Sequence, residues 1–156
     1  MGGTRLRPGD ILELDCGDGV AYFSYVGRHP ILGDTIWVVP AVFDVPLADP
    51  VRAFTRPGYY AFYPAHTAVR QKLIRGRGFS ADAMRMLPKR MRNVINLNSD
   101  GSVASWLITD GISNVPRREL TPEEQTLPIA AIWNHPLLVD RIRRNWSPAS
   151  GNVGID

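Results

Sequence analysis

Prolines and glycines interrupt this sequence so often that they leave little room for long helices or strands. The chain of 156 residues contains 13 prolines and 14 glycines. Proline fixes φ and lacks a backbone donor, and glycine favours turns, so both tend to end regular structure. This punctuation predicts many short elements joined by tight turns, which is typical of a β-rich fold.

Alternating residues predict a hairpin near the N-terminus. In residues 11–16, Leu12, Leu14 and Cys16 fall on one face, and Glu13 and Asp15 fall on the other. Such alternation indicates a half-buried strand. A turn containing Asp-Gly follows, so residues 11–16 and 20–26 should pair antiparallel. Residues 34–39 predict a third strand.

The middle of the chain carries weaker signals. Residues 41–57 predict a long connection with one short helical turn, and the aromatic run 58–63 predicts a strand. A proline precedes residues 65–73, whose apolar positions share one helical face, so this segment predicts a helix that ends by Gly76. Residues 80–87 predict a second short helix with a serine N-cap.

The second half of the chain predicts one more hairpin and two more helices. Residues 93–98 and 103–109 flank an Asp-Gly turn. The sequence Thr-Pro-Glu-Glu at 121–124 is typical of a capping box at a helix start. Residues 129–133 favour an extended segment, and residues 134–145 predict an amphipathic helix capped by its first asparagine.

Together these elements predict one α+β domain over residues 1–156. We expect mostly antiparallel strands in a small bent sheet or partly open barrel, with short peripheral helices. A parallel doubly wound sheet is disfavoured because too few long helices alternate with the strands. Residues 147–156 are expected to be a loose tail.

Composition favours a cytoplasmic protein. The chain is 44% hydrophobic and 21% charged, as in globular domains, and its apolar runs are too short to cross a bilayer. Residues 1–8 lack the apolar run of a secretory signal. The single cysteine, Cys16, cannot form an internal disulfide and is expected to be a buried structural thiol.

Charge is distributed unevenly behind the net value of +3. Residues 10–49 hold seven acids and one base, and residues 70–92 hold eight bases and one acid. Such a dipole could steer charged partners. Alternatively, the two segments lie against each other and neutralise each other.

Specific catalytic motifs are missing from the sequence. There is no Walker loop, dinucleotide fingerprint or nucleophile elbow, and one cysteine cannot form a zinc finger or ribbon. The run Arg75-Gly76-Arg77-Gly78 predicts a basic turn. We therefore assign no catalytic residue, no metal ligand and no cofactor.

Two other functions stay open as alternatives. His29, His66 or His135 with Asp34 could hold the metal of a hydrolase, although no pair has ligand spacing and ordinary hydrogen-bonded histidines are favoured. Residues 70–92, preceded by several aromatics, could bind single-stranded nucleic acid. Core aromatics beside solvated charges are the simpler interpretation, since arginine outnumbers lysine sixteen to two along the whole chain.

The four tryptophans also allow two interpretations. Trp37 and Trp106 fall in expected strands and should be core residues. Trp133 and Trp146 flank the last helix and could clamp it to the sheet. Exposed, they would be interface anchors.

The opening sequence carries a family resemblance. The run RPGDILEL at residues 7–14, followed by Asp18-Gly19 and Ala21-Tyr22, resembles the start of the bacterial immunity protein 26 family. The segment from Leu120 to Asn134 is similar to the end of uncharacterised bacterial proteins that share this opening. The resemblance implies a non-catalytic protein that neutralises a toxin by binding it.

These observations predict a non-catalytic protein-binding domain, with a toxin as its partner and no association with a membrane. The alternatives are a metal-assisted hydrolase and a nucleic-acid-binding protein. The residues expected to contact the partner are charged or aromatic: Asp15, Asp18, Asp34, Arg75, Arg77 and Trp133.

Overall fold

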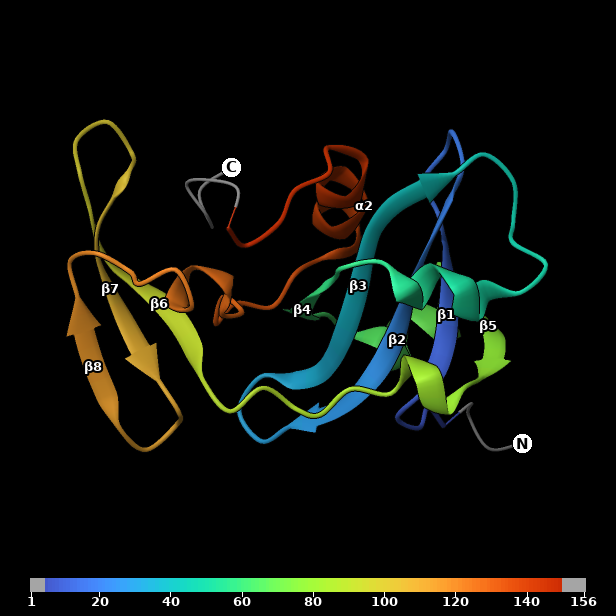
Figure 1. The fold of residues 1–156 in the computed structure, drawn as a ribbon, viewed down its shortest axis with the longest axis horizontal. Helices are drawn as coiled ribbons and strands as arrows, with labels where there is room; N and C mark the ends of the chain where they lie inside the picture. Colours follow the sequence, from blue (N-terminus) through green and yellow to red (C-terminus); the bar gives the residue numbers. More distant parts are fainter. Residues whose placement is uncertain (1–4, 150–156) are drawn as a thin grey trace.

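Two antiparallel sheets form the framework of the protein. A computed structural model describes residues 5–149 (Figure 1). Five strands form one sheet in the order β4-β3-β2-β1-β5, and three form a second sheet in the order β6-β7-β8. The strands are β1 (Asp10–Asp15), β2 (Val20–His29), β3 (Gly33–Phe43), β4 (Tyr59–Phe62), β5 (Ile74–Phe79), β6 (Met91–Leu97), β7 (Val103–Thr109) and β8 (Asn114–Arg117).

Short helices complete the fold. The helices are α1 (Ala65–Arg70) and α2 (His135–Arg143), with 3-10 turns η1 (Pro50–Thr55), η2 (Ala81–Ala83) and η3 (Glu124–Thr126). The α+β class with mostly antiparallel strands is thus confirmed, and over residues 5–149 the strands do not close into a barrel. No helix in this part of the chain is long and apolar enough to cross a membrane.

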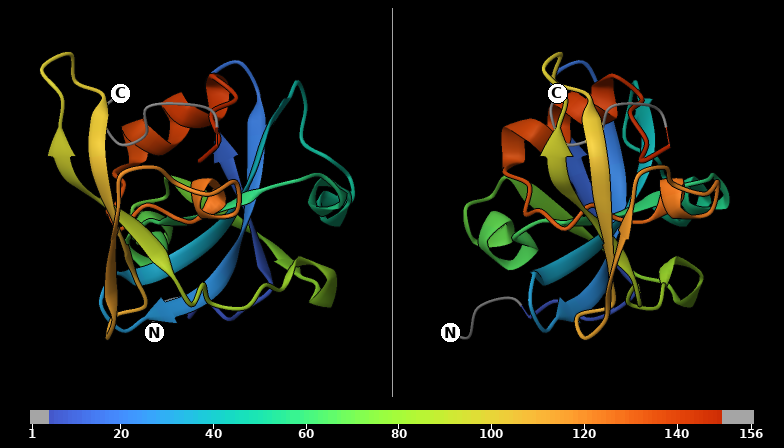
Figure 2. Two further views of the ribbon diagram at one scale, coloured as in Figure 1. Left: turned by 60° about the vertical axis from the view of Figure 1, so that its left-hand side comes forward. Right: turned by 90° about the vertical axis from the view of Figure 1, so that its left-hand side faces the viewer.

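The five-stranded sheet buries apolar side chains on both of its faces. One face carries the larger core, in which Leu12 and Phe23 pack with Leu138 of α2 and Trp106 of β7. The α2 helix lies over this sheet and the three-stranded sheet stands beside it (Figure 2). The opposite face carries a smaller cluster around Tyr22, which η1 and η2 cover. The turns η1 and η2 cover only part of this second face.

The strands expected from alternation all form. Residues of β1 and β2 pair antiparallel, as predicted, with Asp15 opposite Val20 beside the turn. The third strand, β3, continues past Pro40, because the pairing between β2 and β3 is irregular there. At such a bulge a residue without an N–H does not break the ladder. The second hairpin, β6 with β7, is also confirmed.

Three sequence predictions require correction, and one strand was not predicted. The basic run around Gly76 is not a turn but the middle of β5, paired antiparallel with β1. The helix before it ends at Arg70, three residues earlier than predicted. The helix predicted over residues 80–87 is the single turn η2, although Ser80 does cap it by accepting from the Asp82 N–H. Strand β8 carries no sequence signal that we recognised.

The C-terminal predictions are confirmed within the described residues. Thr121 and Glu124 form the reciprocal hydrogen bonds of a capping box, at 3.0 and 3.2 Å. The Asn134 side chain accepts from the Leu137 N–H at 2.9 Å and so caps α2. The predicted loose tail over residues 147–156 falls mainly outside the described residues, since the description ends at residue 149.

An arginine between two tryptophans fastens α2 to the larger core. The Arg141 guanidinium lies 4.4 Å from the ring centres of both Trp133 and Trp146. Trp133 is 3% exposed and Arg141 is 2% exposed. The two tryptophans therefore clamp the last helix from inside the protein, as one of the two interpretations expects.

Candidate functional site

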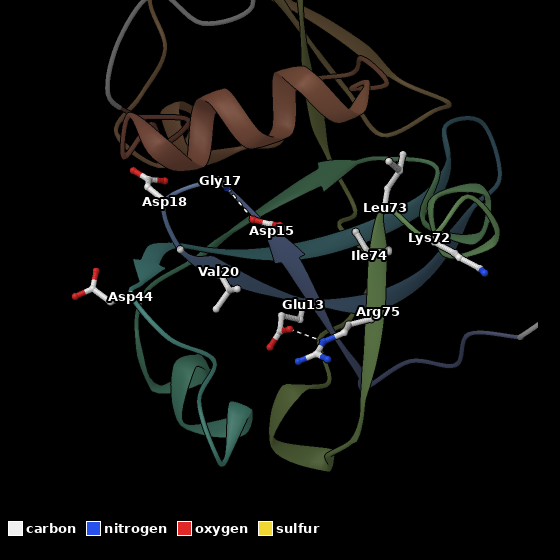
Figure 3. A pocket seen from close by; sticks show the side chains of 11 residues that line it. Glu13, Asp15, Gly17, Asp18, Val20, Asp44, Lys72, Leu73, Ile74 and Arg75 are labelled. Carbon is white, nitrogen blue, oxygen red and sulfur yellow. Dashed lines mark hydrogen bonds and ion pairs between the residues drawn. The ribbon is translucent and has the colours of Figure 1, made fainter.

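The second face of the five-stranded sheet is left open at one end and forms a hollow there. The hollow measures about 570 Å³ and lies beside the turn between β1 and β2 (Figure 3). Its lining comes from three strands (β1, β2 and β5) and the three connections beside them, and includes Glu13, Asp15, Asp18, Val20, Asp44, Lys72, Leu73, Ile74 and Arg75. We call this set of residues the acidic hollow.

Three exposed aspartates stand around the acidic hollow. Asp15 ends β1, and one of its carboxylate oxygens accepts from the Gly17 N–H at 2.8 Å, which fixes the turn. Asp18, at the tip of the turn, lies 3.7 Å from the guanidinium of Arg143. Asp44 follows β3 and enters the rim because its neighbour Phe43 pairs with Val20. Their carboxylates give this end of the sheet a negative rim.

A buried carboxylate lies at the floor of the acidic hollow. Glu13 is only 6% exposed, although alternation placed it on a solvent face. Its two oxygens accept hydrogen bonds at 2.5 Å from Arg75 and Arg77, and one also accepts from the Tyr22 hydroxyl at 2.9 Å. Burial alone would raise the pKa of Glu13, but the bonds from Arg75, Tyr22 and Arg77 hold the pKa below its ordinary value.

The same network holds the connection after β3, which begins with Asp44 of the acidic hollow. The backbone of Leu47, in the connection after β3, donates to the Tyr22 hydroxyl and accepts from Arg77, both at 2.8 Å. Val20, Leu73 and Ile74 supply the apolar part of the lining. An apolar surface surrounded by carboxylates suits a lysine or arginine side chain, whose stem is apolar and whose end is positive.

The structure brings together some of the predicted contact residues and separates others. Asp15, Asp18 and Arg75 line the acidic hollow, and Arg77 adjoins it through Glu13. Asp34 instead lies near the turn between β2 and β3, at the opposite end of the sheet. Trp133 is buried in the core, so it cannot reach a partner's surface.

Comparisons of the chain with protein-family models, curated proteins and solved structures find no match. The chemistry of the molecule therefore has to be inferred from its own geometry.

Part of the uneven charge of the sequence is paired within the fold. Strand β5, from the basic segment, pairs directly with β1, from the acidic segment, and places Arg75 opposite Glu13. Arg90 pairs with Glu123 at 2.8 Å, and Arg92 is buried with its guanidinium 4.8 Å from the Trp106 ring centre. Of the two interpretations of the charge pattern, mutual neutralisation describes the contact between β5 and β1.

The histidines are dispersed and make ordinary structural contacts. His29 Nδ1 accepts the N–H groups of Ile31 and Leu32, at 3.1 and 3.2 Å. His66 contacts Asp34, and His135 Nδ1 lies 2.9 Å from the Tyr63 hydroxyl. Burial lowers the pKa of both His29 and His135. Among residues 5–149, no group of three His, Cys, Asp or Glu side chains could hold a metal ion.

Cys16 has the environment predicted for a structural thiol. It is buried in the larger core. Burial, together with the charges of Asp18 and Asp15, raises its pKa to about 11. The thiolate that a nucleophile requires is therefore disfavoured at neutral pH.

Sequence reasoning missed several residues of the acidic hollow. Asp44 and Val20 join it through the pairing of β2 with β3, and Lys72 and Leu73 join it because β5 begins just after them. The last two could be placed only through β5. Residues 74–79 had to be recognised as an edge strand, which the two glycines within them concealed.

Proposed function

We propose that this protein is a non-catalytic binding domain that holds a basic segment of a partner protein in the acidic hollow. The observation that carries the proposal is the arrangement of Asp15, Asp18 and Asp44, three exposed carboxylates around an apolar lining. Complementary charge of this kind favours rapid and selective association more than it adds affinity. The partner class that fits is a protein with exposed lysine or arginine residues.

Glu13 supports a binding role over an acid-base role for this site. It is the buried carboxylate at the centre of the hollow, and both of its oxygens accept hydrogen bonds from arginines. A general base needs a free acceptor near a substrate proton and a pKa near the working pH. Glu13 has neither, because its pKa lies below the ordinary value of a glutamate.

An immunity-type toxin inhibitor is the specific form of this proposal. The resemblance of residues 7–22 to an immunity family motivates it. Many toxins that act on nucleic acid are basic because they bind phosphates, so they would carry the lysine and arginine residues that this hollow suits. The basic segment of this chain is the obvious objection. Arg75 and Arg77 answer part of that objection, since Glu13 balances one of their two charges, and the three rim aspartates outnumber the remaining arginine charge and Lys72.

Calorimetric titration with a toxin domain encoded beside the gene tests the proposal. The test variant combines Asp15→Asn, Asp18→Asn and Asp44→Asn. A matched control combines Asp49→Asn, Asp82→Asn and Glu119→Gln, which changes the net charge equally at exposed positions outside the hollow. We expect the first variant to weaken binding at least about tenfold and the control to change it by less than about twofold. Absence of saturable binding, or equal losses in both variants, contradicts the proposal.

A further inference from the structure

A second hollow lies at the other end of the five-stranded sheet. It measures about 490 Å³ and lies between the turn that joins β2 to β3 and helix α1. Because consecutive turns of antiparallel strands fall at opposite ends of a sheet, this hollow is remote from the acidic hollow. Its ionisable lining residues are Arg28, Asp34, His66 and Arg70, and we call it the arginine hollow.

The two arginines of this hollow have no close carboxylate partner within residues 5–149. The Arg28 side chain is 78% exposed, and its nearest approach to a carboxylate is 4.0 Å, to Asp34. Arg70 donates to the neighbouring Thr67 hydroxyl at 3.1 Å and forms no ion pair in this part of the chain. Arg75 and Arg77, by contrast, both lie 2.5 Å from Glu13. Arginines therefore contact a carboxylate closely at one end of the sheet and are available to a ligand at the other.

Asp34 is a distant partner of Arg28, at 4.0 Å, and its oxygens accept shorter hydrogen bonds from other groups. One oxygen accepts from the backbone N–H of His66 at 3.0 Å and lies 2.9 Å from His66 Nδ1. The other accepts from the Tyr25 hydroxyl at 3.1 Å. The Asp34 side chain is only 7% exposed. Its structural role is to fix the beginning of α1, which in turn places Thr67 and Arg70 in the lining.

Apolar side chains surround the two guanidinium groups. Leu32, Tyr63, Pro64 and Ile132 contribute to the lining, and Ile132 is 61% exposed. Ligand sites commonly combine such apolar walls with a few polar groups that orient the ligand. Guanidinium groups in turn select planar carboxylates and phosphates, which they can bind through two parallel hydrogen bonds.

We propose that the arginine hollow binds a small molecule that carries an oxyanion on an apolar group. Arg28 and Arg70 hold the carboxylate or phosphate, the Thr67 hydroxyl is available as an additional hydrogen-bonding group, and Leu32 and Ile132 contact the apolar part. This inference goes beyond the proposed protein-binding function, because it concerns a different end of the sheet and requires no partner protein.

Nuclear magnetic resonance of the full chain tests this binding directly. Amide signals are followed while phenyl phosphate, benzoate, inorganic phosphate or phenol is added at constant ionic strength. We expect phenyl phosphate or benzoate to shift the amides of Gly33, Thr67 and Arg70 in a saturable manner. Inorganic phosphate should bind more weakly, since it lacks the apolar group, and phenol should not bind. The stronger of the first two probes identifies the anion class.

Three variants make the test specific. Arg28→Ala and Arg70→Ala should each weaken the binding of the better probe by about fivefold or more, because each removes one guanidinium contact. Arg52→Ala removes an exposed arginine from η1, outside the hollow, and should leave the affinity unchanged. The proposal is overturned if phenol binds as tightly as the anions, or if the amide signals beside exposed arginines outside the hollow shift as much as those inside it. It is also overturned if Arg52→Ala weakens binding as much as the other two changes.

Discussion

Arg77 and Glu13 are separated by 64 positions in the sequence, and the Arg77 guanidinium donates to the Glu13 carboxylate at 2.5 Å. The pair joins β5 to β1 across the second face of the sheet. Arg77 also holds the Leu47 carbonyl, so the same contact fixes the connection after β3. Arg77 therefore links the buried carboxylate of the acidic hollow to the connection that begins with Asp44.

Removing the Glu13 carboxylate should destabilise the fold. Glu13→Ala leaves Arg77, whose side chain is 20% exposed, without its carboxylate partner, and leaves the Tyr22 hydroxyl without an acceptor. We expect the free energy of unfolding to fall by about 2 to 4 kcal/mol. Urea denaturation measures it. Glu119→Ala, at an exposed position, is the control and should stay within about 0.5 kcal/mol of the parent. A similar small change for Glu13→Ala would show that the network contributes little.

The same carboxylate should make stability depend on acid. The folded pKa of Glu13 lies below its ordinary value of 4.5, so its charged form contributes stability above that value. This contribution is lost as the pH falls through the folded pKa. The difference in unfolding free energy between the parent and Glu13→Gln should therefore be constant near neutral pH and shrink in the acid range. A difference that grows on acidification would contradict the lowered pKa.

Two glycines should respond oppositely to the same substitution. A Cβ at Gly58 would lie 2.4 Å from the Val38 carbonyl oxygen and 2.5 Å from Trp37 Nε1, whereas a Cβ at Gly76 meets nothing within 4 Å. Gly58→Ala should lower the free energy of unfolding by about 1 to 3 kcal/mol. Gly76→Ala should be neutral or stabilising by about 0.5 kcal/mol, because alanine restricts the unfolded chain. Thermal unfolding of both variants checks the pair, and a destabilising Gly76→Ala would argue against the strand.

Neighbouring arginines of α2 should differ in their contribution. Arg141→Ala removes the guanidinium between Trp133 and Trp146 and should lower the free energy of unfolding by about 2 kcal/mol or more. Arg143→Ala removes an exposed ion pair with Asp18 and should change it by less than about 1 kcal/mol. Denaturation of the two variants under one set of conditions gives the comparison. Equal effects would mean that the tryptophan contact adds nothing beyond charge.

Much of the fold could be predicted from local patterns. Both hairpins and the caps at Thr121 and Asn134 followed from residue alternation, turn residues and hydrogen-bonding side chains. Strand β5 could not, because its pairing with β1 depends on contacts distant in the sequence, and its glycines favour a turn in local terms.

The candidate site was predicted only in part for the same physical reason. Asp15 lies at the end of the first predicted strand and Asp18 in the turn that follows, so the sequence already placed the two close together. Asp44 joins them through the pairing of β2 with β3, and the neutralisation of Glu13 depends on β5. Asp34 and Trp133 were predicted to contact the partner because of their residue types. Residue type does not reveal that Asp34 lies at the opposite end of the sheet or that Trp133 is buried.

Strand β5 lies at an edge of the sheet, where a second copy of the protein could add a strand. Among the described residues β5 pairs with β1 on one side only, so its other backbone edge is an open template for a further strand. Antiparallel pairing of two β5 edges would bring Arg75 and Arg77 of one molecule against the same arginines of the other. A single glutamate per molecule balances only one of each two charges. Electrostatic repulsion between these arginines therefore disfavours edge-to-edge aggregation into continuous sheets.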